Sequence, residues 1–461
     1  MLVVHLPDNC RAERSYVLDV VLGEFLGLRF DVAWVPGATQ VSIRDGDHGP
    51  ALRLADDFFA WAADHWLEAG VPLPLAGPAA ALPRARLAPF DDALPVMFGH
   101  AGADGAWTHG DAGGATLGLD VFGAAFFMLS RYEELVSAAR DEHGRFPASA
   151  SVAGQAGLLE RPIVDDYVQV LWHALERLWP RLDRRAGAFR THLTHDVDLP
   201  LKHGFSPWYR TGAAALRDAV RSGPSAAVGR LRAWRTVRGG RPEIDPYNTF
   251  GWLMDLAERQ GLRGAYYFLA GRHHAHDGLY EIEHPFIARL MRDLHARGHE
   301  IGLHPSYTTY LDAARTADEF ARLRRAAEGA GVRQSGWGGR QHFLRWRNPD
   351  TLRNWESAGL LYDSTLGYAD HNGFRCGVCR EYPAYDLPQR RRMSLRLRPL
   401  IMMESTFATH MKLGWGQRAL DHAVRLKDAC RRVDGDFVLL WHNSNLVTPE
   451  QRATLGAVLE A

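Results

Sequence analysis

The sequence of 461 residues predicts an α/β protein, with a smaller mixed α/β domain over 1–185 and a barrel of parallel strands over 186–461. In the second half, strand-like apolar runs alternate with amphipathic helical patterns, which is typical of parallel sheets and barrels. Several of those runs end in ionisable residues. In a parallel barrel such ends meet on the face that carries the active site.

The first domain is predicted from helical stretches separated by short apolar runs. The stretches cover 14–28, 122–139 and 164–179, and prolines flank the third of them. The run Ser-Arg-Tyr-Glu-Glu at 130–134 could be a ligand surface, but we interpret it as a helix end or a contact between domains. This half shows no acid–base pattern at metal-ligand spacing, so we expect the site in the second domain.

The second domain is predicted from strand-like runs and the helices between them. The runs are 189–193, 264–269, 300–304, 335–343, 360–365, 400–406 and 437–442. The helical patterns are 249–260, 285–297, 318–328, 349–358 and 417–432. Glycines stand near the expected helix ends, as they do at many helix C-termini.

Composition excludes several classes of protein. Lys plus Arg equals Asp plus Glu, at 54 each, so no overall field favours nucleic acid. Four cysteines are too few for a disulfide scaffold of this size. The first residues show neither a basic segment nor a long apolar one, and no stretch has the apolar length of a spanning helix. We therefore expect a soluble, cytoplasmic protein without a nucleic-acid partner.

An Arg-rich insert at about 205–245 interrupts the second domain. Its arginines surround Trp234, and Asp218 stands nearly alone against them. A solvated helical face is the simpler interpretation. The alternative is peripheral contact with an anionic membrane surface or with a phosphate-bearing saccharide carrier.

Two short segments, about a hundred residues apart, carry the strongest chemical signal. In Thr-His-Asp-Val-Asp, Asp196 and Asp198 are two residues apart, so both side chains can point to one side of an extended strand. Such a pair repels unless a cation or a proton lies between its members. The second segment, Gly-His-Glu-Ile-Gly-Leu-His, ends in His304. Together they favour a divalent metal that works with a general base.

Over about 189–445, the second domain resembles the NodB-homology polysaccharide deacetylases, carbohydrate esterase family 4. Five motifs stand in the order of that family: Thr194 to Asp198, Gly298 to His304, Arg340 to Phe343, Asp363 in Tyr-Asp-Ser-Thr, and Leu440 to His442. The first domain resembles one that precedes the barrel in a subgroup of these proteins. The resemblance implies a deformed (β/α)7 barrel and the removal of an acetyl group from an amino sugar of an oligo- or polysaccharide or its precursor.

The resemblance also implies roles for the residues that hold the metal and move protons. Asp196 would be the general base, and Asp198 a metal ligand. His304 would be a second metal ligand, and His442 the general acid. These residues fit amide hydrolysis, which needs an activated water and a protonated leaving amine.

Two further residues would orient the general base and the general acid. Arg340 would hold Asp196 by charge-assisted hydrogen bonds and keep it ionised. Asp363, with Asp370 as the alternative in its motif, would orient His442 and raise its pKa.

The chain departs from the family pattern at the second histidine of the metal motif. Four residues after His304 stands Thr308, where the family has its further ligand. Catalytic zinc usually has three protein ligands, so another side chain would have to replace it. His342 is our candidate, because it lies at the end of the next strand-like run. His195 is a weaker one, because alternation turns it away from the two acids.

Two other functions stay open beside the metal-dependent deacetylase. A metal-independent amidohydrolase that acts on a small cyclic amide would fit the same barrel and the missing histidine. A catalytically silent barrel that binds saccharide is the third. It has no need of the trio Asp196, Arg340 and His442, all of which are present.

Overall fold

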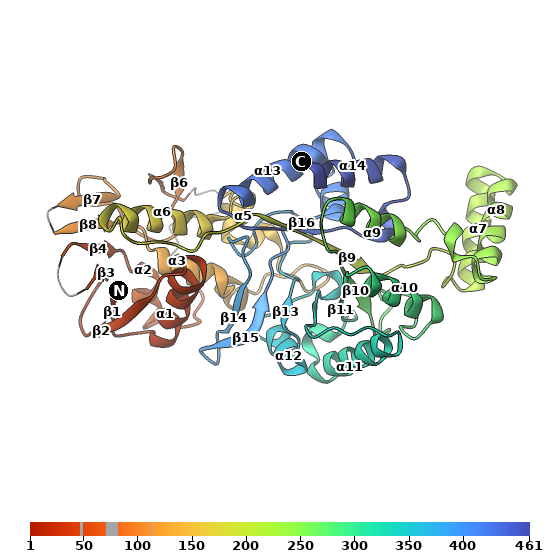
Figure 1. Cartoon of the computed structure of the whole chain (residues 1–461), viewed down its shortest axis with the longest axis horizontal. Coiled ribbons are helices and arrows are strands. Elements are labelled where there is room, and N and C mark those ends of the chain that lie inside the picture. Colours follow the sequence, from red (N-terminus) through yellow and green to blue (C-terminus); the bar gives the residue numbers. More distant parts are fainter. Residues whose placement is uncertain (47–48, 71–81, 112) are drawn as a thin grey trace.

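The computed structural model describes residues 1–46, 49–70, 82–111 and 113–461. They form a six-stranded sheet in the first part of the chain and a nine-stranded sheet in the second. Figure 1 shows the two parts following one another along the long axis of the molecule. The prediction of an α/β fold with parallel strands is confirmed.

The first sheet mixes parallel and antiparallel pairs in the order β2-β1-β3-β4-β8-β7. Its strands are β1 (Leu2–Pro7), β2 (Phe30–Val35), β3 (Val41–Asp45), β4 (Ala51–Leu54), β7 (Thr108–Asp111) and β8 (Gly114–Leu117). A separate pair joins β5 (Arg84–Arg86) to β6 (Ala93–Pro95).

The helices of the first part match the expected stretch 164–179 closely and depart from the other two expected stretches. They are α1 (Arg11–Leu18), α2 (Asp57–Ala62), α3 (Val121–Leu129), α4 (Tyr132–Val136), α5 (Val152–Gln155) and α6 (Ile163–Leu178). The expected helix at 14–28 changes to π-helical geometry over 19–25. The expected helix at 122–139 divides into α3 and α4 because Arg131, between them, has a left-handed backbone with φ of 54°.

The second sheet has the order β14-β15-β13-β12-β11-β10-β9-β17-β16. Its strands are β9 (Arg190–Val197), β10 (Ala265–Leu269), β11 (Glu300–His304), β12 (Gly338–Gly339), β13 (Tyr362–Asp363), β14 (Tyr382–Asp386), β15 (Arg391–Leu397), β16 (Met402–Met403) and β17 (Asp436–Leu440). Neighbours are parallel except for the β14–β15 hairpin, which the sequence analysis did not foresee. The strand order ends at β14 and β16, so the closed (β/α)7 barrel stays a prediction.

The helices of the second part follow the expected alternation with the strands. They are α7 (Trp208–Ser222), α8 (Pro224–Arg238), α9 (Phe250–Arg259), α10 (Pro285–Ala296), α11 (Ala313–Gly329), α12 (Asp350–Ala358), α13 (Gln417–Arg432) and α14 (Pro449–Glu460). The Arg-rich insert folds into the pair α7–α8, at the far right of Figure 1. Among the described residues, none of the helices has both the length and the apolar character needed to span a membrane.

The Ser-Arg-Tyr-Glu-Glu run joins the two parts of the chain. Glu134 accepts two hydrogen bonds from the guanidinium of Arg375, at 2.6 and 2.9 Å, and a third from Arg131. All three side chains are buried, and the two guanidinium groups lower the pKa of Glu134 although burial alone would raise it. The run is therefore a contact between the parts, one of the two interpretations preferred above. The domain limit at residue 185 stays a prediction.

This contact directs the segment that follows α4, at 137–150, toward the second sheet. The Arg345 guanidinium donates to the backbone oxygen of His143 at 2.7 Å, and the backbone nitrogen of Ala148 donates to Asp370 at 3.3 Å. The first part of the chain thus reaches the carboxyl ends of the strands that carry the site.

Candidate metal centre

The residues predicted for the site lie at the carboxyl ends of neighbouring parallel strands. Asp196 is the last residue but one of β9, and His304 ends β11. Arg340 follows β12 directly, and His442 follows β17 by two residues. Because β17, β9, β10, β11 and β12 are consecutive in the sheet, their ends bring these side chains to one edge.

Asp198, His304 and His342 form a three-residue cluster that could hold a metal ion. One ligand atom from each lies within 4.8 Å of the other two. The Nε2 atom of His304 lies 3.1 Å from Asp198 Oδ1, and that of His342 lies 3.6 Å from the same oxygen. His342 thus lies where the sequence analysis needed a replacement ligand.

Two atoms of this cluster lack hydrogen-bond partners among the described residues, which bears on whether a cation fits between them. Asp198 Oδ1 and His304 Nε2 are both buried, and neither has a hydrogen-bond partner in the described part of the chain. Buried polar atoms without partners are costly. A carboxylate oxygen and an imidazole nitrogen are both ligand atoms for zinc, so the donor set fits a divalent cation.

Both histidines of the cluster turn Nε2 inward because Nδ1 is held from behind. The Nδ1 atom of His304 donates to the carbonyl oxygen of Arg340 at 2.6 Å, and that of His342 donates to Asp277 at 3.2 Å. In a neutral ring this leaves the lone pair on Nε2. Metal-binding histidines are commonly oriented in this way.

Asp277 is a supporting residue that the sequence analysis missed. It lies in the loop after β10, and its carboxylate accepts from the backbone nitrogens of His273, His274 and Tyr307. Burial would raise its pKa, but the hydrogen bonds from His342 and the backbone lower the pKa of Asp277 to about 2. Its carboxylate is therefore ionised at neutral pH and can fix the His342 ring.

The charges of the cluster stabilise one another. Burial alone would raise the pKa of Asp198, but the neighbouring imidazoles of His342 and His304 lower it. Burial alone would lower the pKa of His304, but the carboxylates of Asp196 and Asp198 raise it. The site is thus built around an ionised Asp198 that needs positive charge beside it.

Asp196 lies beside the cluster and is held by Arg340. The Arg340 guanidinium donates to Asp196 Oδ1 at 2.9 Å, and its other nitrogens donate to the backbone and hydroxyl oxygens of Ser364. Arg340 is completely buried, and its guanidinium lies 5.1 Å from the centre of the Tyr267 ring. Asp196 Oδ2 is free of that ion pair and lies 3.8 Å from His304 Nε2.

His442 faces the second oxygen of Asp198, with its Nε2 atom 3.5 Å from Asp198 Oδ2. Its Nδ1 atom donates to Glu404 at 2.6 Å, and Asn445 donates to the same carboxylate at 2.7 Å. Burial alone would lower its pKa, but the Glu404 carboxylate raises the pKa of His442 to about 10. The imidazole therefore carries a proton on Nε2 at neutral pH.

The carboxylate that contacts His442 is Glu404 rather than Asp363. In the described chain no hydrogen bond or ion pair joins Asp363 to His442; its carboxylate accepts from the backbone nitrogen and hydroxyl of Thr365. Burial raises the pKa of Asp363 to about 6. The reason is strand order: four strands lie between β13 and β17, whereas β16, which Glu404 follows, is the neighbour of β17.

The remaining candidates lie away from the cluster. The Nδ1 atom of His195 donates to the carbonyl of Trp441, and its ring packs against Tyr266, as strand alternation predicts. The hydroxyl of Thr308 accepts from Arg315. Asp370, the alternative to Asp363, accepts from the segment that follows α4.

The cluster opens into a cavity of about 170 Å³. Asp196 and His442 line it, together with apolar side chains such as Phe343 and Met403. Arg145 from the first part of the chain also lines this cavity. Its Nε atom is paired with Asp141 at 2.7 Å, and its Nη1 atom donates to the carbonyl of Phe343 at 3.1 Å. No local motif marks Arg145, so the sequence analysis could not find it.

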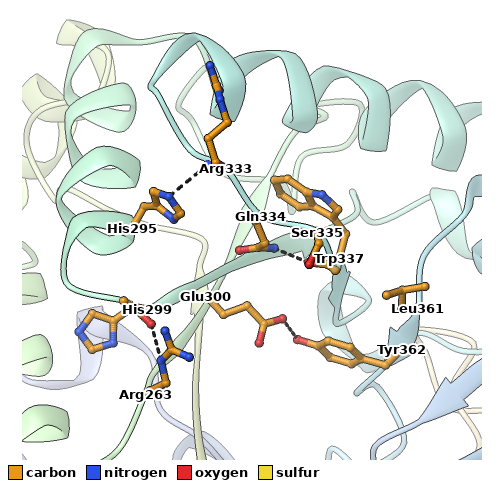
Figure 2. Close-up of a pocket in the computed structure, with 12 residues that line it drawn as sticks. Arg263, His295, His299, Glu300, Arg333, Gln334, Ser335, Trp337, Leu361 and Tyr362 are labelled. Carbon is orange, nitrogen blue, oxygen red and sulfur yellow. Dashed lines mark hydrogen bonds between the residues drawn. The ribbon is translucent and has the colours of Figure 1, made fainter.

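A larger cavity, of about 480 Å³, lies at the opposite edge of the same sheet. Figure 2 shows its lining residues, which come from the amino ends of β11 and β13 and from the segments before β10 and β12. The hydroxyl of Tyr362 donates to Glu300 at 2.5 Å, and the Arg263 guanidinium donates to the backbone oxygen of Gly298. None of the predicted catalytic or metal-binding residues lines this cavity.

Comparison with known proteins gives one match to a family. Residues 2–180, less than half of the chain, match a family of unknown function, DUF7033. The chain has no match among curated proteins.

Three solved structures resemble the chain at low similarity. The first, described as a polysaccharide deacetylase from Mycobacterium smegmatis, is 17% identical with a TM-score of 0.39, over 60% of this chain and 84% of its own. The second, the Puue allantoinase, is 16% identical with a TM-score of 0.34, over 59% and 84%. The third, described as a polysaccharide deacetylase from Pseudomonas aeruginosa PAO1, is 16% identical with a TM-score of 0.33, over 59% and 84%. TM-scores of this size carry no conclusion about activity, which rests on the residues of the site itself.

Proposed function

We propose that the chain is a metal-dependent hydrolase that removes an acetyl group from an amino sugar of an oligo- or polysaccharide or its precursor. One observation carries the proposal. The cluster of Asp198, His304 and His342 lies beside a carboxylate held by an arginine, Asp196, and beside an imidazole held by a carboxylate, His442. A base and an acid beside a cation site are the groups that amide hydrolysis needs.

Asp198, His304 and His342 would hold the cation through the oxygen and the two Nε2 atoms that face one another. A divalent cation such as zinc, when bound there, would lower the pKa of a water molecule and polarise the amide carbonyl.

Asp196 would accept a proton from the attacking water. Its Oδ2 atom faces the cluster while Oδ1 is bound by Arg340. The arginine fixes the direction of the carboxylate by a charge-assisted hydrogen bond to one oxygen, so that the other oxygen is available as the base.

His442 would donate a proton to the departing nitrogen. Glu404 holds Nδ1 and keeps the ring protonated, so the proton on Nε2 points toward the cavity. As the bond between the carbonyl carbon and the nitrogen breaks, this proton completes the amine, and the acetyl group leaves as acetate. Asp196 and His442 therefore have opposite proton roles in one reaction.

The motif order, rather than the cavity, suggests the acetylated amino sugar as the substrate. We also propose that residues 1–185 form a separate domain and take part in binding the substrate, because Arg145 lines the cavity. Arg145 contributes a guanidinium to the cavity wall. Among its described contacts, the carboxylate paired with it is that of Asp141. The guanidinium would donate hydrogen bonds to oxygen atoms of the sugar.

The test is metal content and acetate release measured on one preparation. We expect the purified protein to contain a divalent metal, to lose acetate release from acetylated amino sugars after chelation, and to regain it on adding zinc. Asp196→Asn is the matched variant, because it should keep the metal and lose the activity. Full activity without any metal would contradict the proposal and favour the metal-independent amidohydrolase. Metal binding without hydrolysis of any acetylated amino sugar would favour the silent barrel.

A further inference from the structure

The Arg-rich insert forms a two-helix hairpin, α7–α8, that stands apart from both sheets (Figure 1). Its helices are held to each other by the ion pair between Arg230 and Asp218 at 2.5 Å. The indole nitrogen of Trp234 donates to the backbone oxygen of Ser206 at the base of the hairpin. The hairpin is therefore a folded, projecting element rather than an irregular loop.

The hairpin exposes an apolar stripe that an ordinary surface helix would bury. On α7, Tyr209, Leu216 and Val220 follow helical spacing, and their exposed fractions are 56%, 69% and 81%. Trp208 beside them is 74% exposed. On α8, Val228 and Leu231 are exposed too. Of the twelve exposed large apolar side chains in the described part of the chain, these six belong to the hairpin. Such a concentration marks a contact surface.

The same hairpin concentrates positive charge in a chain that is neutral as a whole. Seven arginines and a single acidic residue lie within 208–238, whereas the complete chain has 54 residues of each sign. The acidic residue, Asp218, is already paired with Arg230. Arg232 and Arg235 are among the exposed arginines of α8. The contact surface therefore combines apolar side chains with unbalanced cationic ones.

We propose that the α7–α8 hairpin docks on an anionic lipid surface. Aromatic and aliphatic side chains would enter the interface between headgroups and acyl chains, while the arginines would bind the phosphates. Charge complementarity selects this occupant. A second copy of the chain would place arginines against arginines, which is unfavourable.

The position of the hairpin links docking to the cavity, a point that rests on the proposed function. The hairpin begins ten residues after Asp198 and is anchored by Asp245, which accepts from the backbone nitrogens of Lys202 and His203. It therefore arises from the carboxyl edge of the sheet, the edge that carries the metal cluster. Docking would hold that edge near a lipid surface, where a lipid-borne saccharide would be within reach.

The experiment is co-sedimentation of the full chain with vesicles of phosphatidylcholine alone or with added phosphatidylglycerol. We expect binding to the anionic vesicles that weakens at high salt, and little binding to the neutral ones. Leu216→Ser/Val220→Ser and Arg232→Glu/Arg235→Glu should each reduce binding about tenfold or more. Arg177→Glu/Arg181→Glu is the matched control, because these exposed arginines lie on and just beyond α6, in the first part of the chain, and should leave binding unchanged.

Two outcomes would overturn the proposal. The first is equal binding by the wild type, both hairpin variants and the control, or no binding by any of them. The second is concentration-dependent self-association that Leu216→Ser/Val220→Ser abolishes while vesicles have no effect, which would make the face an interface between copies. Thermal unfolding and acetate release from a soluble substrate verify folding of the variants. If acetate release is absent from the wild type while vesicle binding is present, the proposed function fails and the docking proposal stands.

Discussion

The two edges of the nine-stranded sheet carry cavities of different size and different chemistry. The amino edge has the larger cavity, about 480 Å³, and its acid Glu300 is already bound by the hydroxyl of Tyr362 (Figure 2). The carboxyl edge has about 170 Å³, yet Asp198 Oδ1 and His304 Nε2 face each other there without hydrogen-bond partners. Polar atoms that the fold brings together and leaves unsatisfied indicate a site better than volume does.

The difference follows from parallel strand geometry. At its carboxyl end a parallel strand is followed by the connection to the next helix. Asp198, His342 and His442 lie at the start of such connections. The amino ends receive short segments from the preceding helices, and several of the polar groups there bind nearby backbone. Gln334, for example, donates to the carbonyl oxygens of Ile301 and Gly336.

The largest effect should come from the two proton-transferring residues at the carboxyl edge. Asp196→Asn and His442→Ala should each lower kcat by roughly a hundredfold or more, because each removes one proton transfer. Tyr362→Phe at the amino edge is the control and should leave kcat unchanged. Steady-state acetate release measures the three, and near-normal turnover by folded Asp196→Asn would remove Asp196 from the mechanism.

The metal content of purified variants should distinguish the residues of the cluster from the residues around it. Asp198→Ala, His304→Ala and His342→Ala should each lose bound metal, whereas Asp363→Asn should retain it, because Asp363 is bound to Thr365 outside the cluster. Asp277→Asn should weaken metal affinity by about tenfold or more, as expected when a histidine loses its supporting carboxylate. Elemental analysis of purified variants is the measurement, and unchanged metal in His342→Ala would restrict the site to two protein ligands.

The contact between Glu404 and His442 makes a third prediction. Glu404→Gln should lower kcat about tenfold with little change in KM, because His442 loses the carboxylate that holds and charges it. Glu404→Asp should recover part of that loss. A larger drop in kcat for Asp363→Asn than for Glu404→Gln would restore the assignment that the sequence favoured.

Arg145 should affect substrate binding rather than the chemical step. Arg145→Ala should raise KM roughly tenfold and leave kcat nearly constant. A tenfold weaker binding corresponds to the free energy of about one hydrogen bond from a charged donor. Glu142→Ala in the same segment is the control, because its side chain is 86% exposed. If KM stays constant in Arg145→Ala, the first part of the chain does not contact the substrate through this residue.

The smallest effect belongs to the amino edge. Tyr362→Phe should lower the free energy of unfolding by about 1 kcal/mol, because Glu300 loses its hydrogen bond there. Tyr209→Phe on the exposed face of α7 should change it by much less. Chemical denaturation of the two variants decides this. A selective loss of activity in Tyr362→Phe, without a loss of stability, would mean that the larger cavity takes part in function.

The sequence predicted best what depends on a few consecutive residues. The Asp-Val-Asp spacing and the strand-end position of His304 required only alternation along a strand, and in the structure Asp196, Asp198 and His304 lie side by side. The Asp363 assignment required knowing which strand lies beside β17, and spatial neighbours do not follow from order along the chain. Glu404 lies within the expected strand-like run 400–406, but its contact with His442 could not be predicted from the sequence.

Other features were beyond pattern reading for different reasons. The β14–β15 hairpin has a readable signal, since Met393, Leu395 and Leu397 alternate with polar residues, but an antiparallel pair is unexpected in a parallel series. Arg145 gave no signal, because its place depends on the buried contact that joins two segments more than two hundred residues apart.

That contact between Glu134 and Arg375 also limits how the protein can be divided. Removing one partner of a buried ion pair typically costs 3–5 kcal/mol, on the order of a third of the stability of an ordinary domain. A gene cut near residue 185 would therefore yield a second half with a guanidinium that lacks its counter-charge and a cavity that lacks the Arg145 wall. In a recombination experiment, the two halves should therefore be exchanged together. A half taken from another protein would be tolerated only if it carries the residue that pairs with Glu134 or with Arg375.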